Sequence, residues 1–239
     1  MRSLVIIPAR FNSSRFPGKP LVNINGKSMI QRVFEQVQKC QEVTDIIIAT
    51  DDIKIFDHVK SFNGSAIMTL KNHLSGTDRC NEVVKKIEKK YDVIINVQGD
   101  EPIINPKQIT KVINCFKDNS NKIVTLAKKI SSKKEIEDPS TVKVDFSSEM
   151  IATNFYRTQE TLKSITHKHL GIYGFKTTIL EKICALPATR NELKHKLEQL
   201  RWLDNDYKIK IAITDFDSIA IDTKDDLENL LKNHSDKLA

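Results

Sequence analysis

Short apolar, β-rich runs alternate with amphipathic stretches through the first half of the chain. This alternation is typical of βα units, which build a parallel sheet with helices on both faces. The expected strands are Leu4–Ile7, Ile46–Ala49, Ala66–Met68, Val93–Val97 and Ile123–Ala127. The expected helices are Met29–Lys39, Asp78–Lys89 and Pro106–Phe116, which carry apolar residues at helical spacing. The sequence therefore predicts a doubly wound α/β fold with a mostly parallel sheet.

The pattern changes after about residue 128. Three strand-like runs, Thr141–Phe146, Met150–Phe155 and His169–Phe175, follow one another with no full helix between them. They predict a small antiparallel insertion or dimerisation arm at about 141–175. Helices at Thr177–Leu186 and Glu192–Asp204, a strand at Ile209–Ile213 and a last helix from Thr223 complete the expected order. Because a chain of 239 residues can bury one sizeable core, we expect a single domain over residues 1–239.

The composition narrows the class of protein. The net charge of +7 favours anionic partners, but the lysines are scattered and no nucleic-acid-binding motif occurs, so a small anionic ligand is expected and nucleic acid is not. The chain has no long apolar run and no apolar stretch behind a basic start, which predicts a soluble, cytoplasmic protein without a membrane segment. Its four cysteines lie far apart and are expected to be buried free thiols.

The first expected strand runs directly into a loop from Pro8 to Pro20 that contains three cations, Arg10, Arg15 and Lys19. Ligands of open α/β sheets bind beyond the carboxyl ends of the strands, so this position favours a polyphosphate site over an ordinary turn-rich surface loop. The nearby Gly26-Lys27-Ser28 lacks the earlier glycine of a Walker loop. There, Asn25-Gly26 is expected to form a turn and Ser28 to cap a helix.

Two aspartates follow apolar runs and are the expected Mg²⁺ ligands. Asp100 follows the strand Val93–Val97, and Asp222 precedes the last helix. Mg²⁺ commonly binds one or two carboxylates together with substrate phosphates. Capping roles remain open for Glu101 and for Asp222 or Thr223. Asp51 and Asp52, after another strand, are further carboxylates at the same edge or else turn and capping residues.

Six segments in order resemble the 3-deoxy-manno-octulosonate (Kdo) cytidylyltransferases, and the resemblance covers nearly the whole chain. The segments are Ile7–Arg10 with Pro17–Leu21, Ala49–Asp52, Ser75–Arg79, Asn96–Pro102, His169–Tyr173 and Leu197–Arg201. Each segment alone is weakly specific, whereas six in the same order are specific. The resemblance implies a Rossmann-like nucleotidyltransferase fold and a Mg²⁺-dependent enzyme of lipopolysaccharide biosynthesis. The enzyme would transfer CMP from CTP to the anomeric hydroxyl of Kdo and release pyrophosphate. The resemblance also implies that it is a homodimer.

The resemblance also implies a role for each matching residue. CTP would be held by Pro8, Ala9, Arg10, Arg15, Lys19 and Arg79, and Mg²⁺ by Asp100 and Asp222. Gln98, Arg157, His169, Tyr173, Glu198 and Gln199 would line the sugar pocket. Arg15, Lys19 and Asp100 would be the catalytic residues. Taken by itself, Glu198 would be a solvated partner of Arg201, and His167 with His169 would be weak evidence for zinc.

Three positions depart from the family's pattern. Thr158–Thr161 replaces an Ile-Pro pair, His195 replaces an acidic residue, and Ala220 replaces a frequent glycine. These changes leave open a modified acceptor, such as 8-amino-Kdo, or a divergent lineage. A synthetase for a sialic-type acid and a non-catalytic nucleotide-binding module are further alternatives. The segment His169–Tyr173 favours Kdo as the acceptor. The presence of both Asp100 and Asp222 favours an enzyme over a non-catalytic module.

Overall fold

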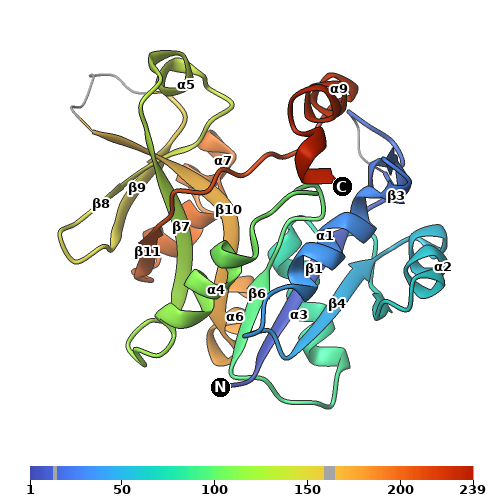
Figure 1. The fold of residues 1–239 in the computed structure, drawn as a ribbon. Coiled ribbons are helices and arrows are strands. Elements are labelled where there is room, and N and C mark those ends of the chain that lie inside the picture. Colours follow the sequence, from blue (N-terminus) through green and yellow to red (C-terminus); the bar gives the residue numbers. More distant parts are fainter. Residues whose placement is uncertain (13–14, 159–164, 239) are drawn as a thin grey trace.

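The computed structural model describes residues 1–12, 15–158 and 165–238, and its centre is a single mixed β-sheet (Figure 1). Seven strands follow one another in hydrogen-bonded order across this sheet. The order is β11 (Ile209–Ile213), β7 (Ile123–Ile130), β10 (Thr166–Lys176), β6 (Val93–Asn96), β1 (Ser3–Ala9), β4 (Asp45–Thr50) and β5 (Ala66–Met68). All of the neighbours pair in parallel except β10, which is antiparallel to both β6 and β7. The predicted doubly wound, mostly parallel sheet is confirmed.

The strand-rich region after residue 141 divides between the main sheet and an arm. Strand β10 lies in the middle of the sheet, whereas β8 (Lys143–Phe146) and β9 (Ala152–Tyr156) pair with each other outside the main order. In Figure 1 these two strands project at the left, and β8 pairs with the main sheet at β10. A short hairpin of β2 (Asn23–Ile24) and β3 (Lys27–Ser28) forms a second, separate sheet.

Helices cover both faces of the sheet because alternate residues of each buried strand point to opposite sides. Val5 and Ile7 of β1 pack with helices α1 (Met29–Gln38), α2 (Ile53–Ser61) and α4 (Pro106–Cys115). Leu4 and Ile6 pack with α3 (Gly76–Lys86), α6 (Thr177–Cys184) and α8 (Gln199–Asp204). The all-apolar strand sequences are therefore explained by two cores, one on each face.

A third, smaller apolar cluster joins the N-terminal loop to the C-terminus. It contains Phe16, Ile24, Met29, Ile221, Leu230 and Leu238. These residues come from the loop after β1, the β2–β3 hairpin, α1, the segment before helix α9 (Lys224–Asn233), α9 itself and the last turn, η2 (Ser235–Leu238). The cluster thereby packs the residue before Asp222 near the loop that carries Arg15 and Lys19.

The prediction of a single helix over Glu192–Asp204 was wrong. The chain forms α7 (Arg190–His195) and α8 with a break at Lys196, whose φ of 54° lies in the left-handed region. The break lets Arg201 reach back to Glu192, with Arg201 Nε 2.7 Å from Glu192 Oε2, while Leu197 and Leu200 enter the core. Two helices were not predicted, α2 and α5 (Lys133–Glu137).

Several smaller predictions can also be compared with the structure. Among the described residues, no helix has the length and apolar character needed to cross a bilayer. The four cysteines are free thiols, and two of them, Cys40 and Cys80, are buried. Trp202 lies in the core and is 1% exposed. The predicted turn at Asn25-Gly26 has both residues at positive φ, and the side chain of Ser28 accepts a hydrogen bond from the Gln31 amide as the cap of α1.

Replacing Gly174 with alanine should destabilise the sheet. A methyl group there would lie 2.6 Å from atoms of both Phe116 and Val112, so α4 would have to move away from β10. We expect Gly174→Ala to lower the free energy of unfolding by about 1–3 kcal/mol, measured by urea denaturation. Gly171→Ala in the same strand is the control, because its methyl group would meet its nearest neighbour at 3.6 Å. Equal stabilities of the two variants would contradict this packing.

Candidate active site

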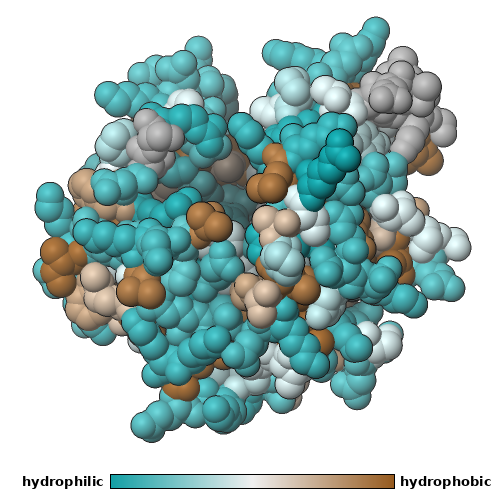
Figure 2. Space-filling view, turned by 180° about the vertical axis from the view of Figure 1, so that it is seen from behind, coloured by the Kyte–Doolittle hydropathy of each residue, from teal (hydrophilic) through white to brown (hydrophobic). Residues whose placement is uncertain are grey.

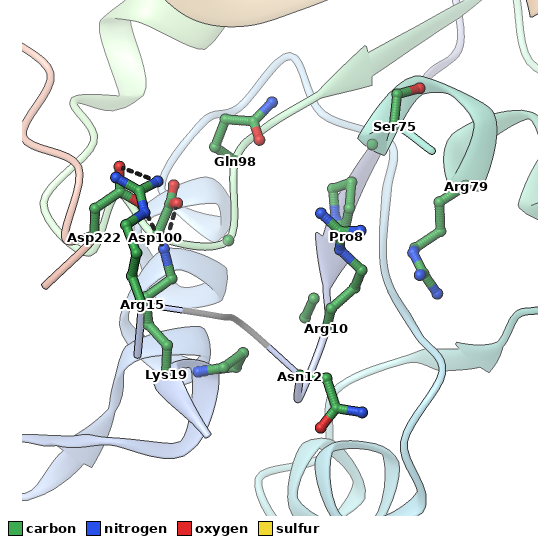
Figure 3. Close-up of a pocket in the computed structure, with 14 residues that line it drawn as sticks. Pro8, Arg10, Asn12, Arg15, Lys19, Ser75, Arg79, Gln98, Asp100 and Asp222 are labelled. Atoms are coloured by element: carbon green, nitrogen blue, oxygen red, sulfur yellow. Dashed lines mark hydrogen bonds and ion pairs between the residues drawn. The ribbon is translucent and has the colours of Figure 1, made fainter. Parts of the chain in front are cut away.

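A cavity of about 460 Å³ opens at the carboxyl ends of β1 and β6 (Figure 3). The loop after β1, the start of α3, the residues after β6 and Asp222 form its walls. The lining residues are Pro8, Ala9, Arg10, Asn12, Arg15, Lys19, Pro20, Ser75, Gly76, Arg79, Gln98, Gly99, Asp100 and Asp222. All three predicted phosphate-binding cations and both predicted metal ligands therefore face one space. Because cations outnumber carboxylates there, the cavity suits a strongly anionic ligand.

A second cavity of about 830 Å³ adjoins the first. Four residues, Arg15, Gln98, Asp100 and Asp222, line both cavities. The second cavity extends toward β10 and the arm, with Arg157, Lys168, His169 and Gly171 among its lining residues. Seen from behind in Figure 2, a hollow separates two projections at this edge of the molecule, and the visible surface is mostly hydrophilic. The two aspartates thus lie at the boundary between two ligand-sized spaces.

The two aspartates share a cation. Lys19 Nζ lies 2.7 Å from Asp100 Oδ2 and 3.0 Å from Asp222 Oδ1, and the Lys19 side chain is only 12% exposed. Arg15 Nη2 lies 3.1 Å from Asp222 Oδ2, but its side chain is 64% exposed (Figure 3). Burial strengthens the lysine pairs, whereas the exposed arginine pair is weakened by solvent.

Backbone geometry brings the two aspartates together although they are far apart in the sequence. The amide of Ile221 donates to the carbonyl of Asp100 at 2.9 Å, which fixes Asp222 beside the end of β6. Gly99 is required for the approach, because a Cβ atom there would lie 2.6 Å from the carbonyl oxygen of Pro8. The turn after β6 therefore packs directly on the end of β1, where the cationic loop starts.

The structure decides between the alternative helix caps. Thr223 caps α9 in a capping box with Asp226, so Asp222 is not the cap. Asn105 caps α4, so Glu101 is not a cap either. Glu101 is instead buried, and burial raises the pKa of its carboxyl to about 7.

The pair Asp100 and Asp222 fits Mg²⁺ better than a metal held by protein ligands alone. Among residues 1–12, 15–158 and 165–238, no group of three or more histidine, cysteine, aspartate or glutamate side chains could hold a metal ion. Two carboxylates with phosphates and water complete an ordinary Mg²⁺ shell. The ammonium group of Lys19, in contact with one oxygen of each aspartate, marks a point where a cation is stabilised.

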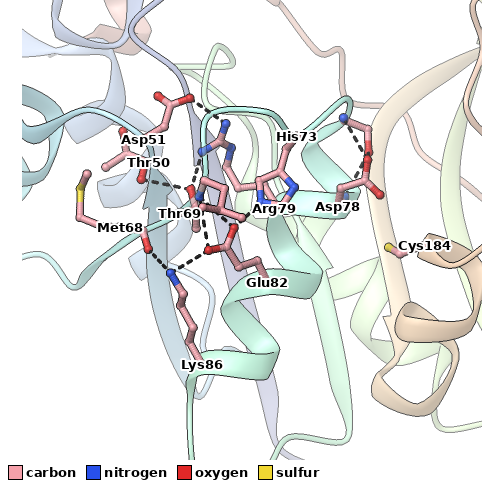
Figure 4. Close-up of polar contacts among 12 residues, drawn as sticks. Thr50, Asp51, Met68, Thr69, His73, Asp78, Arg79, Glu82, Lys86 and Cys184 are labelled. Carbon is pink, nitrogen blue, oxygen red and sulfur yellow. Dashed lines mark hydrogen bonds and ion pairs between the residues drawn. The ribbon is translucent and has the colours of Figure 1, made fainter.

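Arg79 lies in the cavity wall with its charge already paired (Figure 4). Its guanidinium donates to Asp51 Oδ2 at 2.9 Å and to the hydroxyl of Thr69, and the side chain is 1% exposed. Asp52 separately caps α2 by accepting a hydrogen bond from the Lys54 amide. The open question about Asp51 and Asp52 is thereby resolved as one ion pair and one cap.

Three of the predicted sugar-binding residues line the second cavity. Gln98 donates to the carbonyl of Gly171 at 3.3 Å, and Arg157 donates to the carbonyls of Pro139 and Ser140, each at 3.2 Å. These bonds fix both side chains against the walls. Their backbone partners carry no charge, so the positive charge of Arg157 remains available to an anion.

His169, the third of these residues, is a neutral hydrogen-bond donor. Its Nε2 atom lies 2.9 Å from Thr125 Oγ1, and this hydroxyl lies 2.7 Å from the carbonyl of Ile172. Since a carbonyl can only accept, the hydroxyl donates to it and accepts from His169 Nε2. Burial lowers the pKa of His169 to about 3, so the ring carries no charge at neutral pH.

Tyr173, Glu198 and Gln199 line neither cavity and form a layer behind them. The Tyr173 ring lies 5.2 Å from the His169 ring between centroids, and its buried hydroxyl lacks a hydrogen-bond partner among the described residues. Gln199 is buried at the start of α8. Glu198 Oε2 accepts from the hydroxyl of Thr77 at 2.9 Å, whereas Arg201 pairs with Glu192. The alternative role of Glu198 as a solvated partner of Arg201 is therefore wrong.

Several residues that line the cavities have no role predicted from the sequence. Ser75 and Gly76 in the first cavity have a sequence signal, because Ser75 and Asp78 form a capping box at the start of α3. Lys168 in the second cavity pairs with Glu135 and with Asp217. These partners come from distant parts of the chain, so no local pattern could identify the network.

The three departures from the family pattern lie in different places. Ala220 lines the second cavity, and His195 is exposed at the end of α7. Within Thr158–Thr161, Thr158 is exposed and positions 159–161 lie outside the described residues. The His167 and His169 pair has no further metal ligand in the part of the chain that the structure describes.

Glu198→Gln should stabilise the protein at alkaline pH. Burial raises the pKa of Glu198 from 4.5 to about 7, so between these pH values the unfolded carboxyl ionises while the folded one keeps its proton. Wild-type stability must fall through that window, and glutamine removes the loss. We expect a gain of about 1–3 kcal/mol at pH 8 that vanishes near pH 4.5, measured by urea unfolding. The exposed Glu181→Gln should show no such difference, and a pH-independent effect of Glu198→Gln would contradict the assignment.

Sequence comparison identifies proteins similar to this chain. A family model described as Cytidylyltransferase matches residues 4–211. The 3-deoxy-manno-octulosonate cytidylyltransferase of Parabacteroides distasonis is 46% identical over 97% of each chain. The 8-amino-3,8-dideoxy-manno-octulosonate cytidylyltransferase of Shewanella oneidensis is 42% identical over 95% of this chain and 96% of its own.

Solved structures agree with the sequence comparison. CMP:2-keto-3-deoxy-manno-octonic acid synthetase complexed with CTP superposes with a TM-score of 0.93 over 99% of this chain and 100% of its own, at 35% identity. HddC from Yersinia pseudotuberculosis, 18% identical with a TM-score of 0.67 over 97% and 99% of the two chains, shares the fold alone. The extent of these matches shows that the chain belongs to the 3-deoxy-manno-octulosonate cytidylyltransferase family.

Proposed function

We propose that this protein transfers CMP from CTP to the anomeric hydroxyl of 3-deoxy-D-manno-octulosonate and releases pyrophosphate. One observation carries the proposal: Asp100 and Asp222 lie at the boundary of two adjoining cavities and line both. A transferase for two substrates needs its reacting atoms at such a boundary, because nucleotide and acceptor must approach from different sides. The relatives named for this reaction support the same assignment.

The first cavity would hold CTP. Its loop presents Arg10, Arg15 and Lys19, whose charges suit three phosphate groups. Pro8 and Ala9, also assigned to CTP, lie in the same wall, as do Ser75 and Gly76. Arg79 would act mainly by holding that wall, because Asp51 already pairs with its guanidinium.

The second cavity would hold the sugar acid. Arg157 would pair with the carboxylate of the acceptor, and His169 and Gln98 would bind its hydroxyl groups. Tyr173, Glu198 and Gln199 would support this pocket from behind. The aspartates at the boundary then place the acceptor hydroxyl next to the α-phosphate of CTP.

The chemistry is metal-assisted phosphoryl transfer. Asp100 and Asp222 would hold Mg²⁺, which supplies charge neutralisation at the α-phosphate and lowers the pKa of the attacking hydroxyl. The hydroxyl would lose its proton to solvent, and its oxygen would form a bond to the α-phosphorus as the bond to pyrophosphate breaks. Arg15 and Lys19 would neutralise the charge on the leaving group. His169 stays neutral and would orient the acceptor.

A second acceptor, 8-amino-3,8-dideoxy-manno-octulosonate, is favoured by one specific observation. The Shewanella relatives named for this sugar match the chain at 42% identity, close to the 46% of the Parabacteroides relative. Both sugars are acids, so Arg157 would serve either. A cytoplasmic location, a role in lipopolysaccharide biosynthesis and a homodimer built through the arm remain predictions that accompany the proposal.

The reaction itself is tested by pyrophosphate release. We expect release with CTP, Mg²⁺ and Kdo, little release with the other nucleoside triphosphates, and a loss after addition of a chelator. Parallel assays with 8-amino-Kdo and sialic acid identify the acceptor. Asp100→Ala should lower kcat by at least about 100-fold, because the metal would lose a ligand. The proposal fails if CTP gives no pyrophosphate with any of the three acids.

Arg157 should control affinity for the acceptor alone. We expect Arg157→Met to raise the KM for the sugar by about 10-fold or more, because an ion pair with its carboxylate is lost, while the KM for CTP changes less than about twofold. Steady-state kinetics with each substrate varied in turn makes the distinction. Arg190→Met, at an exposed arginine on α7, is the matched control. Equal effects on both KM values would contradict a role in the sugar pocket.

A further inference from the structure

The ammonium group of Lys19 occupies the position between Asp100 and Asp222 that a bridging cation needs. It contacts one oxygen of each aspartate, at 2.7 Å and 3.0 Å, and Arg15 takes the other oxygen of Asp222 at 3.1 Å. The Lys19 side chain is 12% exposed and that of Asp100 is 25% exposed, so these contacts are only partly screened by water. The carboxylate pair is already neutralised by the protein's own cations.

A divalent ion binds the two aspartates poorly while the lysine stays in place. An ion that bridges Asp100 Oδ2 and Asp222 Oδ1 would occupy the position of the ammonium group, and an ion at the other carboxylate oxygens would still be repelled by that positive charge. Tight metal binding therefore requires Lys19 to leave. A displaced and partly buried ammonium group needs another anion, and the space it would enter is the first cavity, which Lys19 also lines.

We propose that Lys19 fills the metal position in the nucleotide-free protein and exchanges partners when CTP enters with its metal. The ammonium group then pairs with the phosphates, and Asp100 with Asp222 becomes available to the ion. Lysine suits this exchange because its charge sits on a flexible stem. The inference rests on the proposed function, and it adds that the site binds metal well only together with nucleotide. By linkage, metal and nucleotide must favour each other equally.

Binding of Mn²⁺ to the nucleotide-free protein tests this role. Mn²⁺ takes the same oxygen ligands as Mg²⁺ and is followed by electron paramagnetic resonance. We expect weak binding to the wild type and at least about fivefold tighter binding to Lys19→Met, which removes the competing charge. Lys19→Arg keeps the charge and should stay within about twofold of the wild type. Lys85→Met is the matched control, because Lys85 also pairs with a carboxylate, Glu181, at 2.9 Å but on the surface.

A second measurement protects the test if Lys19→Met does not fold, as judged by circular dichroism. Mn²⁺ binding to the wild type is then compared with and without CTP, and binding of Mn²⁺ to CTP alone is measured in parallel. CTP should raise the retained Mn²⁺ by at least about fivefold beyond that background. The inference is overturned if folded Lys19→Met binds Mn²⁺ no better than the wild type, or if CTP gives no such gain.

The failure of this inference differs from the failure of the proposed metal site. If Asp100→Ala retains as much Mn²⁺ with CTP as the wild type does, then the metal does not bind at the aspartates. If Asp100→Ala loses the ion but Lys19→Met gains no affinity without nucleotide, then the metal site is correct and only the role of Lys19 is wrong.

Discussion

The parallel pairing of β1 with β6 is the constraint on which the site depends. Register places Ile6 opposite Asn96, the last residue of β6, and the two parallel strands deliver the cationic loop and the turn with Asp100 to one edge of the sheet. The close approach of Gly99 to the carbonyl of Pro8 then sets the separation of these segments. A larger residue at Gly99 would push apart the two groups of charges that the first cavity brings together.

The C-terminal part of the chain completes the site through an ordinary apolar contact. Ile221 packs in the cluster with Phe16 and Leu238, and its amide donates to the carbonyl of Asp100. Asp222 is therefore placed by the residue before it, whereas Thr223 is engaged as the cap of α9. Packing and capping together leave the Asp222 carboxylate turned toward Lys19 and Arg15.

The polar residues of the two cavities differ in whether the protein itself already neutralises their charge. Arg79 and Lys168 are held by acidic partners within the protein, and His169 is kept neutral by burial. Arg10 is exposed, and Arg157 donates to two backbone carbonyls, which carry no charge, so both retain charge for a ligand. This division separates charges that the protein already neutralises from charges that are free to meet a ligand, which residue type alone could not show.

The sequence by itself determined the sheet, because short all-apolar runs between amphipathic segments can be buried only with helices on both faces. It also determined the loop cations and Asp100, since both follow a buried strand directly. Only the tertiary structure decided the central place of β10 and the position of Lys19 between two aspartates. Each of these depends on contacts between residues distant in the sequence, as with Lys19 and Asp222, and local pattern carries no information about such contacts.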